Sequence, residues 1–299
     1  MKKIFFRCCF LICVIAISSC DTNDSKEVIE SNHAAGELKI IADDTFKPLL
    51  GTMIETFNSI NPKAKVEVKY SPQRAAFNSL LAGEVDLIIA GRPLEEDEIN
   101  NIKKTGLKPK VNAVAYDALV FIVHKENPIN AISMDSLQAL LTGKLKGSLV
   151  CDKSNSENLL YLQHHFSLDQ ELKNIKASGS DSSVVEYIST HNQAIGVVGM
   201  AYLSDKDDKQ VSENKSAIKL LSIRYKDSLG IMKASYPVQE EVALKKYPFI
   251  RTIFVINLDG SQNLGTGFAN HLVGERGQRI ILKSGLMPFK VPGRELLIK

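Results

Sequence analysis

Val85-Asp86-Leu87-Ile88-Ile89-Ala90-Gly91-Arg92-Pro93 has an apolar centre that predicts a short strand buried on both faces. Strands of this kind belong to parallel sheets that carry helices on both sides. The preceding sequence alternates in a compatible way, with a strand expected at 38–42, a helix over 49–57, a strand at 66–70 and a helix over 77–81. This order of strands and helices predicts an α/β fold.

The alternation starts again in the second half of the chain. An apolar run at 118–123 predicts another buried strand, and Asn127-Pro128 marks its end. Beyond it we expect helices over 134–141, 159–166 and 184–189, strands at 149–151, 175–178 and 195–198, a charged surface loop at 204–216 and one long last helix over 268–282. These elements form a second α/β unit, and a length of 299 residues also suggests two units.

The first 19 residues have the layout of a secretory signal. A basic start precedes an apolar run at 8–17, which is too short to cross a bilayer stably. The run stops at Ser18-Ser19-Cys20, which resembles the lipobox of bacterial lipoproteins, where the cysteine is acylated and becomes the new N-terminus. We therefore expect a lipoprotein signal peptide at 1–19, lipid on Cys20 and a flexible polar tether at 20–36. An ordinary cleaved signal with an accidental cysteine is the alternative.

Location and composition narrow the classes of function. Asp21 follows the lipidated cysteine, as in lipoproteins that some bacteria retain at the inner membrane, so we expect a periplasm-facing lipoprotein there rather than at the outer membrane. Of five cysteines, three leave with the signal and Cys20 carries lipid, so Cys151 remains and no intrachain disulfide is expected. Removal of the signal takes away three of the 37 basic residues, which leaves 34 basic against 34 acidic residues. A neutral mature chain gives no electrostatic reason to expect binding to nucleic acid.

Polar loops follow several of the expected strands. In an open parallel sheet, ligands bind beyond the carboxyl ends of the strands. The loops read Ala42-Asp43-Asp44-Thr45, Ser71-Pro72-Gln73-Arg74, Ala90-Gly91-Arg92-Pro93 and Asp152-Lys153-Ser154-Asn155-Ser156-Glu157-Asn158. Short polar side chains beside free N–H groups at helix starts form an anion site, and the guanidinium of Arg92 could grip an oxyanion with two hydrogen bonds. The same residues also fit ordinary helix caps, and Ser154 with Glu157 fits a capping box.

Catalytic signatures do not occur in the sequence. It holds no metalloprotease, nucleophile-elbow or phosphate-loop motif. His164 and His165 are adjacent on an expected helix, so their side chains point about 100° apart and cannot share one metal ion. Cys151 ends an apolar strand with no histidine motif nearby, which is typical of a small buried residue. We therefore expect no enzyme, no cofactor and no metal site.

Four stretches together resemble the PstS-like phosphate-binding proteins of ABC transporters, in the type II fold of periplasmic binding proteins. They are 38–48, 85–93, Gln193-Ala194-Ile195-Gly196-Val197-Val198-Gly199, and 268–288 with Glu275-Arg276-Gly277-Gln278-Arg279-Ile280-Ile281 and Gly285. Their order and spacing agree with the family over nearly all of the mature chain. The resemblance implies a two-lobed α/β fold in which each lobe is a mainly parallel sheet flanked by helices, with a ligand cleft between lobe 1 (37–123 plus 237–299) and lobe 2 (124–236).

The resemblance also implies an anion site. Thr45 stands where the family places its first Thr or Ser ligand, Ser71 at the serine of the second loop, and Arg92 at a position that holds Asp or Arg in relatives. Where the family reads Arg, three residues, then Ser-Gly-Thr, this chain has Asp152 and then Ser156-Glu157-Asn158, so only the serine is retained. We expect the ligand to be bound by Asp43, Asp44, Thr45, Ser71, Arg92, Ser156 and Asn158, with Asp43 or Asp44 accepting a proton from hydrogen phosphate.

The resulting hypothesis is a monomeric, lipid-anchored receptor that captures an inorganic oxyanion, above all phosphate, and delivers it to an ABC permease in the inner membrane. Two alternatives stay open. The altered loop at 152–158 could suit a neutral, zwitterionic or cationic solute on the same fold. A scaffold or sensor lipoprotein could retain the fold without taking part in transport.

Overall fold

The computed structural model describes residues 31–204, 213–258, 260 and 262–292. The expected signal peptide, Cys20 and most of the tether therefore lie outside the described residues. The described residues belong to one structural unit that begins at Ser31. Within them, none of the helices combines the length and the apolar character needed to cross a membrane.

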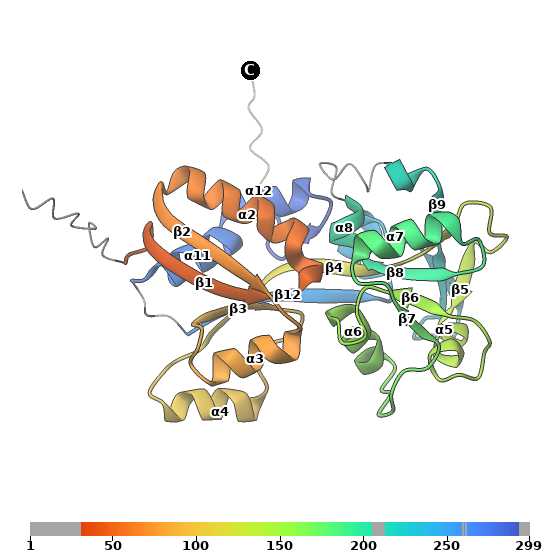
Figure 1. The fold of residues 1–299 in the computed structure, drawn as a ribbon, viewed down its shortest axis with the longest axis horizontal. Helices are drawn as coiled ribbons and strands as arrows, with labels where there is room; N and C mark the ends of the chain where they lie inside the picture. Colours follow the sequence, from red (N-terminus) through yellow and green to blue (C-terminus); the bar gives the residue numbers. More distant parts are fainter. Residues whose placement is uncertain (1–30, 205–212, 259, 261, 293–299) are drawn as a thin grey trace, which may run out of the picture. The chain divides into compact units, whose positions relative to one another are not determined.

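The first half of the chain alternates strands and helices as expected (Figure 1). The apolar residues of the first long helix recur at helical spacing, and four of them, Leu49, Leu50, Met53 and Phe57, are buried. The elements are β1 (Ala35–Ala42), the 3-10 turn η2 (Asp44–Phe46), α2 (Lys47–Ile60), β2 (Lys63–Tyr70), α3 (Gln73–Leu81), β3 (Leu87–Ala90), α4 (Glu96–Lys104) and β4 (Lys110–His124). Every residue of β3 is buried, in agreement with the prediction from its sequence.

The second half contains the expected elements and several short strands besides. They are β5 (Ala131–Ser133), α5 (Met134–Leu141), β6 (Leu149–Cys151), α6 (Glu157–His165), β7 (Ile175–Ala177), α7 (Asp181–Thr190), β8 (Ile195–Gly199), α8 (Met200–Ser204), β9 (Ile218–Leu220), β10 (Ser222–Lys226), β11 (Met232–Ser235), α10 (Gln239–Ala243), β12 (Ile250–Asn257), α11 (Leu264–Val273), α12 (Glu275–Lys283) and β13 (Met287–Pro288). Cys151 is a buried free thiol at the end of β6.

Two long strands join the two halves of the sheet. The strand order is β2-β1-β3-β12-β4-β8-β6-β7. β1 pairs in parallel with β2 and β3, and β6 pairs in parallel with β7 and β8. β12 and β4 are antiparallel to each other and to their other neighbours in this order, β3 and β8. Two parallel groups therefore flank an antiparallel centre, and the expected α/β fold class is confirmed.

Helices cover both faces of the sheet. Figure 1 shows α2, α11 and α12 on one side of the β2-β1-β3 group and α3 and α4 on the other. In the other half, α7 and α8 lie on one side of the β8-β6-β7 group and α6 on the other. This arrangement explains why β3, β6 and β8 are apolar on both faces.

Two local expectations were wrong. The single last helix is divided at Gly274, whose extended backbone (φ −77°, ψ 166°) ends α11 and starts α12. The chain turns tightly there, since a Cβ added to Gly277 would lie 2.1 Å from the carbonyl oxygen of His271. The expected loop at 204–216 begins with the last residue of α8 and contains a helical turn at 213–215, whereas 205–212 lie outside the described residues. The two-lobe boundaries stay a prediction.

Candidate functional site

Polar side chains from five parts of the chain meet beside the two long central strands. Asp43 and Thr45 follow β1, Asp152 and Ser156 lie between β6 and α6, and Asp181 begins α7. Asp117 lies on β4 and Arg251 on β12. All seven of these side chains are buried. Loops at the carboxyl ends of parallel strands are where ligands bind in open α/β sheets, so the cluster has the location of a ligand site.

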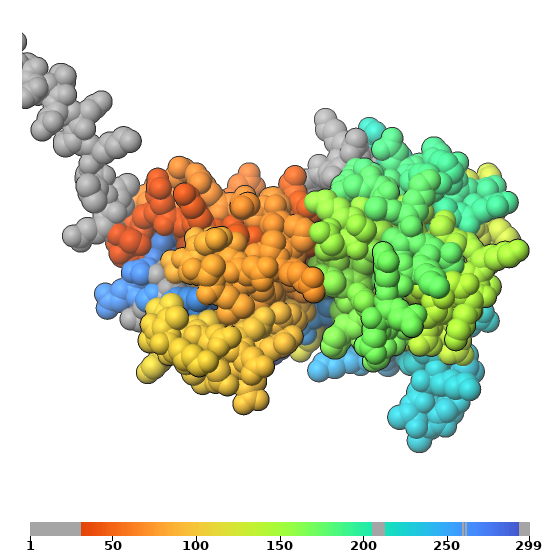
Figure 2. Space-filling model, turned by 60° about the horizontal axis from the view of Figure 1, so that its bottom comes forward, coloured from red at the N-terminus to blue at the C-terminus, as the bar shows by residue number. Residues whose placement is uncertain are grey.

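The loops of the two parallel groups are in direct contact. Lys153 forms an ion pair with Asp44, which joins the loop before α6 to the loop after β1. In Figure 2, the orange part of the chain lies against the green part that contains α6 and α7. The cluster is therefore enclosed in the described conformation.

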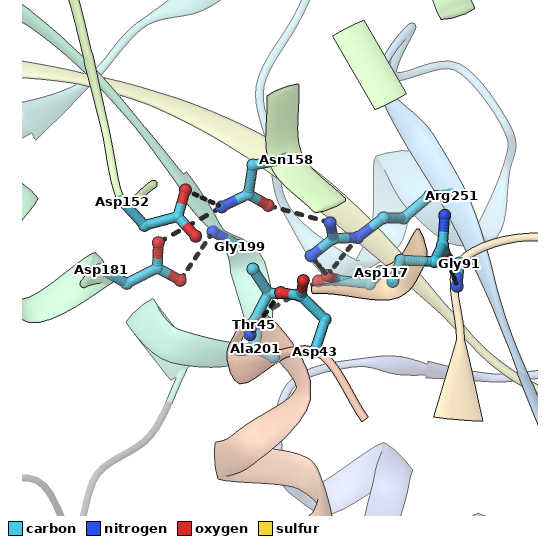
Figure 3. Close-up of polar contacts among 11 residues, drawn as sticks. Asp43, Thr45, Gly91, Asp117, Asp152, Asn158, Asp181, Gly199, Ala201 and Arg251 are labelled. Atoms are coloured by element: carbon cyan, nitrogen blue, oxygen red, sulfur yellow. Dashed lines mark hydrogen bonds and ion pairs between the residues drawn. The ribbon is translucent and has the colours of Figure 1, made fainter. Parts of the chain in front are cut away.

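A buried ion pair forms the centre of the cluster (Figure 3). The Nε and Nη2 atoms of Arg251 donate to Oδ2 of Asp117 over 2.9 and 2.6 Å. The other oxygen of Asp117 accepts from the backbone N–H of Ala201 over 3.1 Å. Within the described part of the chain, Arg251 is the only buried lysine or arginine, so it is the main positive charge available to a ligand in this cluster.

Asn158 links this ion pair to two carboxyl groups. Its Oδ1 accepts from Nη1 of Arg251 over 2.9 Å, and its Nδ2 lies 3.4 Å from Asp152 Oδ1 and 3.3 Å from Asp181 Oδ1. The second oxygen of Asp181 accepts from the backbone N–H of Gly199 over 3.4 Å. Asn158 is thus the shared partner of one cation and two acids (Figure 3).

Acidic groups outnumber the cation in the cluster. Burial raises the pKa of Asp43 and Asp152, and it raises the pKa of Asp181 well above the ordinary range. Burial also raises the pKa of Glu157 to about 8. A carboxyl group that leaves water favours its neutral form unless a cation compensates. Several of these acids therefore retain protons at a pH where exposed carboxyls are ionised.

Glu157 is the first residue of α6 and turns inward. Its side chain is buried, and Oε2 has no hydrogen-bond partner among the described residues. Ser156 caps the same helix by accepting from the N–H of Leu159 over 3.5 Å. The N-terminal end of a helix carries partial positive charge and favours anions. This end of α6 therefore favours an anion, and the carboxyl group of Glu157 lies next to it.

The structure brings together only part of the expected ligand set. Asp43, Thr45, Ser156 and Asn158 are buried in or beside the cluster. Asp44 lies at its edge in the ion pair with Lys153. The backbone N–H of Ser71, whose residue is half-buried, donates to the carbonyl of Ala42 over 2.9 Å.

Arg92 contacts neighbouring residues of its own region of the chain. Its guanidinium makes two 2.8 Å hydrogen bonds to the carboxylate of Glu98 and lies 3.7 Å from the ring centroid of Phe77. The adjacent N–H of Gly91 donates to Oε1 of Gln73 over 2.7 Å. A ligand role for Arg92 would have to share the guanidinium with the Glu98 carboxylate. Ligand binding by each of the seven expected residues stays a prediction.

Sequence reasoning missed three members of the cluster, namely Asp117, Asp181 and Arg251. A signal was available for two of them, because Asp117 adjoins the apolar run at 118–123 and Arg251 lies inside the apolar segment 249–256. Charged residues in such segments are rarely buried without a partner. Among the described residues, acidic, histidine and cysteine side chains form no group of three or more that could hold a metal ion.

The fold and the position of the cluster define a class of protein. The family model described as the PBP superfamily domain matches residues 28–276. The chain belongs to the PBP superfamily.

Two curated relatives carry the name phosphate-binding protein PstS. The protein of Borreliella burgdorferi is 23% identical over 311 residues, and the match covers 97% of this chain and 100% of the relative. The protein of Pseudomonas aeruginosa is 22% identical over 303 residues, covering 91% of this chain and 89% of the relative. Among solved structures, an ABC-type phosphate transport receptor from Vibrio cholerae has a TM-score of 0.65 at 17% identity, covering 85% of this chain and 100% of that chain. The structural likeness confirms the fold.

Proposed function

We propose that this protein is an extracytoplasmic solute-binding protein that captures an inorganic oxyanion, phosphate, and delivers it to an ABC permease. Membership of the PBP superfamily and the two relatives named phosphate-binding protein PstS support this class of function. In this proposal the binding protein is held at the periplasmic side of the inner membrane by lipid on Cys20, and it acts as a monomer without cofactor or catalysis.

One observation carries the choice of an oxyanion. The buried guanidinium of Arg251 and the N-terminus of α6 are joined through Asn158, whose Oδ1 accepts from Arg251 over 2.9 Å. Both groups favour anions. The hydroxyl of Thr45 is buried beside Asp43 on the facing loop and could add a donor.

The surrounding acids would select a protonated oxyanion. An ionised carboxylate accepts a hydrogen bond from a P–OH group, whereas sulfate carries no proton near neutral pH. Asp43, after β1, and Asp152, after β6, would take this role in their ionised forms. Ligand capture would be completed by movement of the two parallel groups about the long strands β4 and β12, which is a common form of closure around a ligand.

Thermal unfolding with added oxyanions tests the proposal. Phosphate at 100 times its dissociation constant should add about 2.7 kcal/mol of stability, and sulfate at the same ionic strength should add little. The Asn158→Ala variant should lose most of the phosphate effect, whereas Arg279→Gln, which removes an exposed arginine from α12, should retain it. An unchanged midpoint at millimolar phosphate would reject phosphate as the ligand.

A second candidate ligand is favoured by the excess of acid. Five carboxyl groups, those of Asp43, Asp117, Asp152, Glu157 and Asp181, are buried with Arg251. Such an environment suits a solute that carries hydroxyl groups or a positive charge. The Asp152→Arg variant separates the two candidates, because a gain of phosphate affinity in this variant would mean that the native loop is adapted to another solute.

A further inference from the structure

We infer that the carboxyl group of Glu157 competes with the ligand for one position in the site. This carboxyl group occupies the space between the N-terminus of α6 and Gly91. An oxyanion that binds there must share this space with the carboxyl group or displace it. The inference rests on the proposed function, since it concerns the same site. It assigns a specificity-determining role to a residue that was not among the expected ligands.

The packing of Glu157 against Gly91 supports this role. A Cβ added to Gly91 would lie 1.8 Å from Oε1 and 2.5 Å from Cδ of Glu157. The backbone of Gly91 does not have a positive φ, so its conformation is open to other residues. The glycine therefore provides room for the Glu157 carboxyl group, which reaches the loop after β3 from the opposite parallel group.

The Glu157 side chain is also incompletely hydrogen-bonded. The residue is only 3% exposed, yet its Oε2 has no hydrogen-bond partner in the part of the chain that the structure describes. A buried oxygen without a partner raises the free energy of the folded state. A bound oxyanion could remove this cost while Glu157 is protonated, because the neutral carboxyl group can donate a hydrogen bond to an anion.

Charged groups from every surrounding element influence Glu157. Arg251 on β12 and Arg92 after β3 favour its ionised form. Asp43 after β1 and Asp117 on β4 oppose it, and burial opposes it most. Tyr161 on α6 also interacts electrostatically with Glu157, and Asp152, Asp181 and the Lys153–Asp44 ion pair belong to the same cluster.

These surroundings set a direction for pH dependence. Burial raises the pKa of Glu157 to about 8, so the side chain is largely neutral at pH 7. Above this pKa an internal negative charge is present at the anion position, and phosphate has to compete with it. Phosphate binding should therefore weaken on the alkaline side of neutrality by more than the ionisation of phosphate and of the other acids explains.

Calorimetric titration with inorganic phosphate from pH 6 to pH 9 tests the inference. The isosteric Glu157→Gln variant removes the charge, Glu157→Gly removes the side chain, and Glu186→Gln on the exposed face of α7 is the matched control. The ratio of dissociation constants, wild type over Glu157→Gln, should be constant well below pH 8 and should increase by up to tenfold per pH unit above it. The control should follow wild type throughout.

A second measurement needs no ligand. Gly91→Ala should lower the thermal midpoint in the wild-type background, because the new methyl group displaces the Glu157 carboxyl, and it should have little effect in the Glu157→Gly background. If the effects of the two substitutions add, the two residues do not share the space and the inference is wrong.

The outcomes separate the inference from the proposed function. If wild type and both Glu157 variants bind phosphate with parallel pH profiles, the proposed function stands and the inference fails. If only the Glu157 variants bind phosphate, the inference stands and phosphate is not the native ligand. If none of them binds phosphate, both are rejected.

Discussion

Arg251 and Asp117 lie directly opposite each other on the antiparallel strands β12 and β4, and both side chains are fully buried. Their two hydrogen bonds of 2.9 and 2.6 Å end on one carboxylate oxygen. The pair thus lies at the antiparallel centre where the two parallel groups join. Removal of either partner would leave an uncompensated charge in the interior.

Loss of this arginine should destabilise the protein strongly. The Arg251→Met variant leaves Asp117 buried without its cation, so the free energy of unfolding should decrease by about 3–5 kcal/mol in urea denaturation. The matched control is Arg279→Gln, which breaks an exposed pair with Glu275 and should cost less than about 1 kcal/mol. Equal costs in the two variants would contradict the burial of the Arg251–Asp117 pair.

Stability should decrease with pH through Glu157. The folded-state pKa is about 8 and the ordinary value is 4.5, so the folded chain retains a proton that the unfolded chain releases. The stabilising contribution is complete below about pH 4.5 and is lost as pH rises towards 8, at no more than about 1.4 kcal/mol per pH unit.

Midpoints of thermal unfolding between pH 5 and pH 8.5 measure this effect. Glu157→Gln should show a shallower decrease than wild type, and Glu186→Gln should match wild type. Some slope should remain in Glu157→Gln, because the raised pKa values of Asp43, Asp152 and Asp181 act in the same direction. Parallel curves for wild type and Glu157→Gln would show that Glu157 titrates as an ordinary acid.

The turn between α11 and α12 should tolerate no side chain at Gly277. A Cβ there would lie 2.1 Å from the carbonyl oxygen of His271, so Gly277→Ala should cost about 1–3 kcal/mol through a forced backbone shift. Gly51→Ala in α2 is the contrasting variant, since its added Cβ would meet no described atom within 4 Å beyond the adjacent residues and the backbone of its own helix. It should gain about 0.5–1 kcal/mol. Similar stabilities of the two variants in urea would contradict the close approach.

The proposed lipid anchor should depend on Cys20. In membrane fractionation and detergent-phase partition, the full chain should follow the membrane, whereas Cys20→Ser should not carry lipid and should leave the lipid-modified fraction. Cys151→Ser, which alters the buried thiol, is the control and should partition like wild type. A Cys20→Ser protein that retains a lipid mass by mass spectrometry would exclude this anchor.

The order of the main elements could be predicted because it is a local property. The period-two alternation of β2 and the helical spacing of Leu49, Leu50, Met53 and Phe57 are visible in short windows. Among the three-residue strands, β6 and β7 were predicted, whereas β5 and β9 were missed because they lack an apolar pattern of their own. The break at Gly274 was missed because the apolar residues continue at helical spacing across it.

The candidate site could be predicted only in outline. The sequence placed Asp43, Thr45, Ser156 and Asn158 in loops at strand ends, and the structure brings these loops together. The contacts of Arg92 were not foreseeable, because Glu98 becomes its partner only when the capping turn of α4 forms. Arg251 and Asp117 were missed because they are 134 positions apart in the chain.

The sequence alone determined the alternation of strands and helices, the polar loops at the strand ends and the family to which they point. Contacts between distant parts of the folded chain determine which charged side chains are buried, which of them are paired, and that the carboxyl of Glu157 lies against Gly91. The physical reason is that burial and charge pairing depend on the register of distant strands and on contacts between loops. Local periodicity contains no information on either, so the chemistry of the site emerges only when β4 and β12 align.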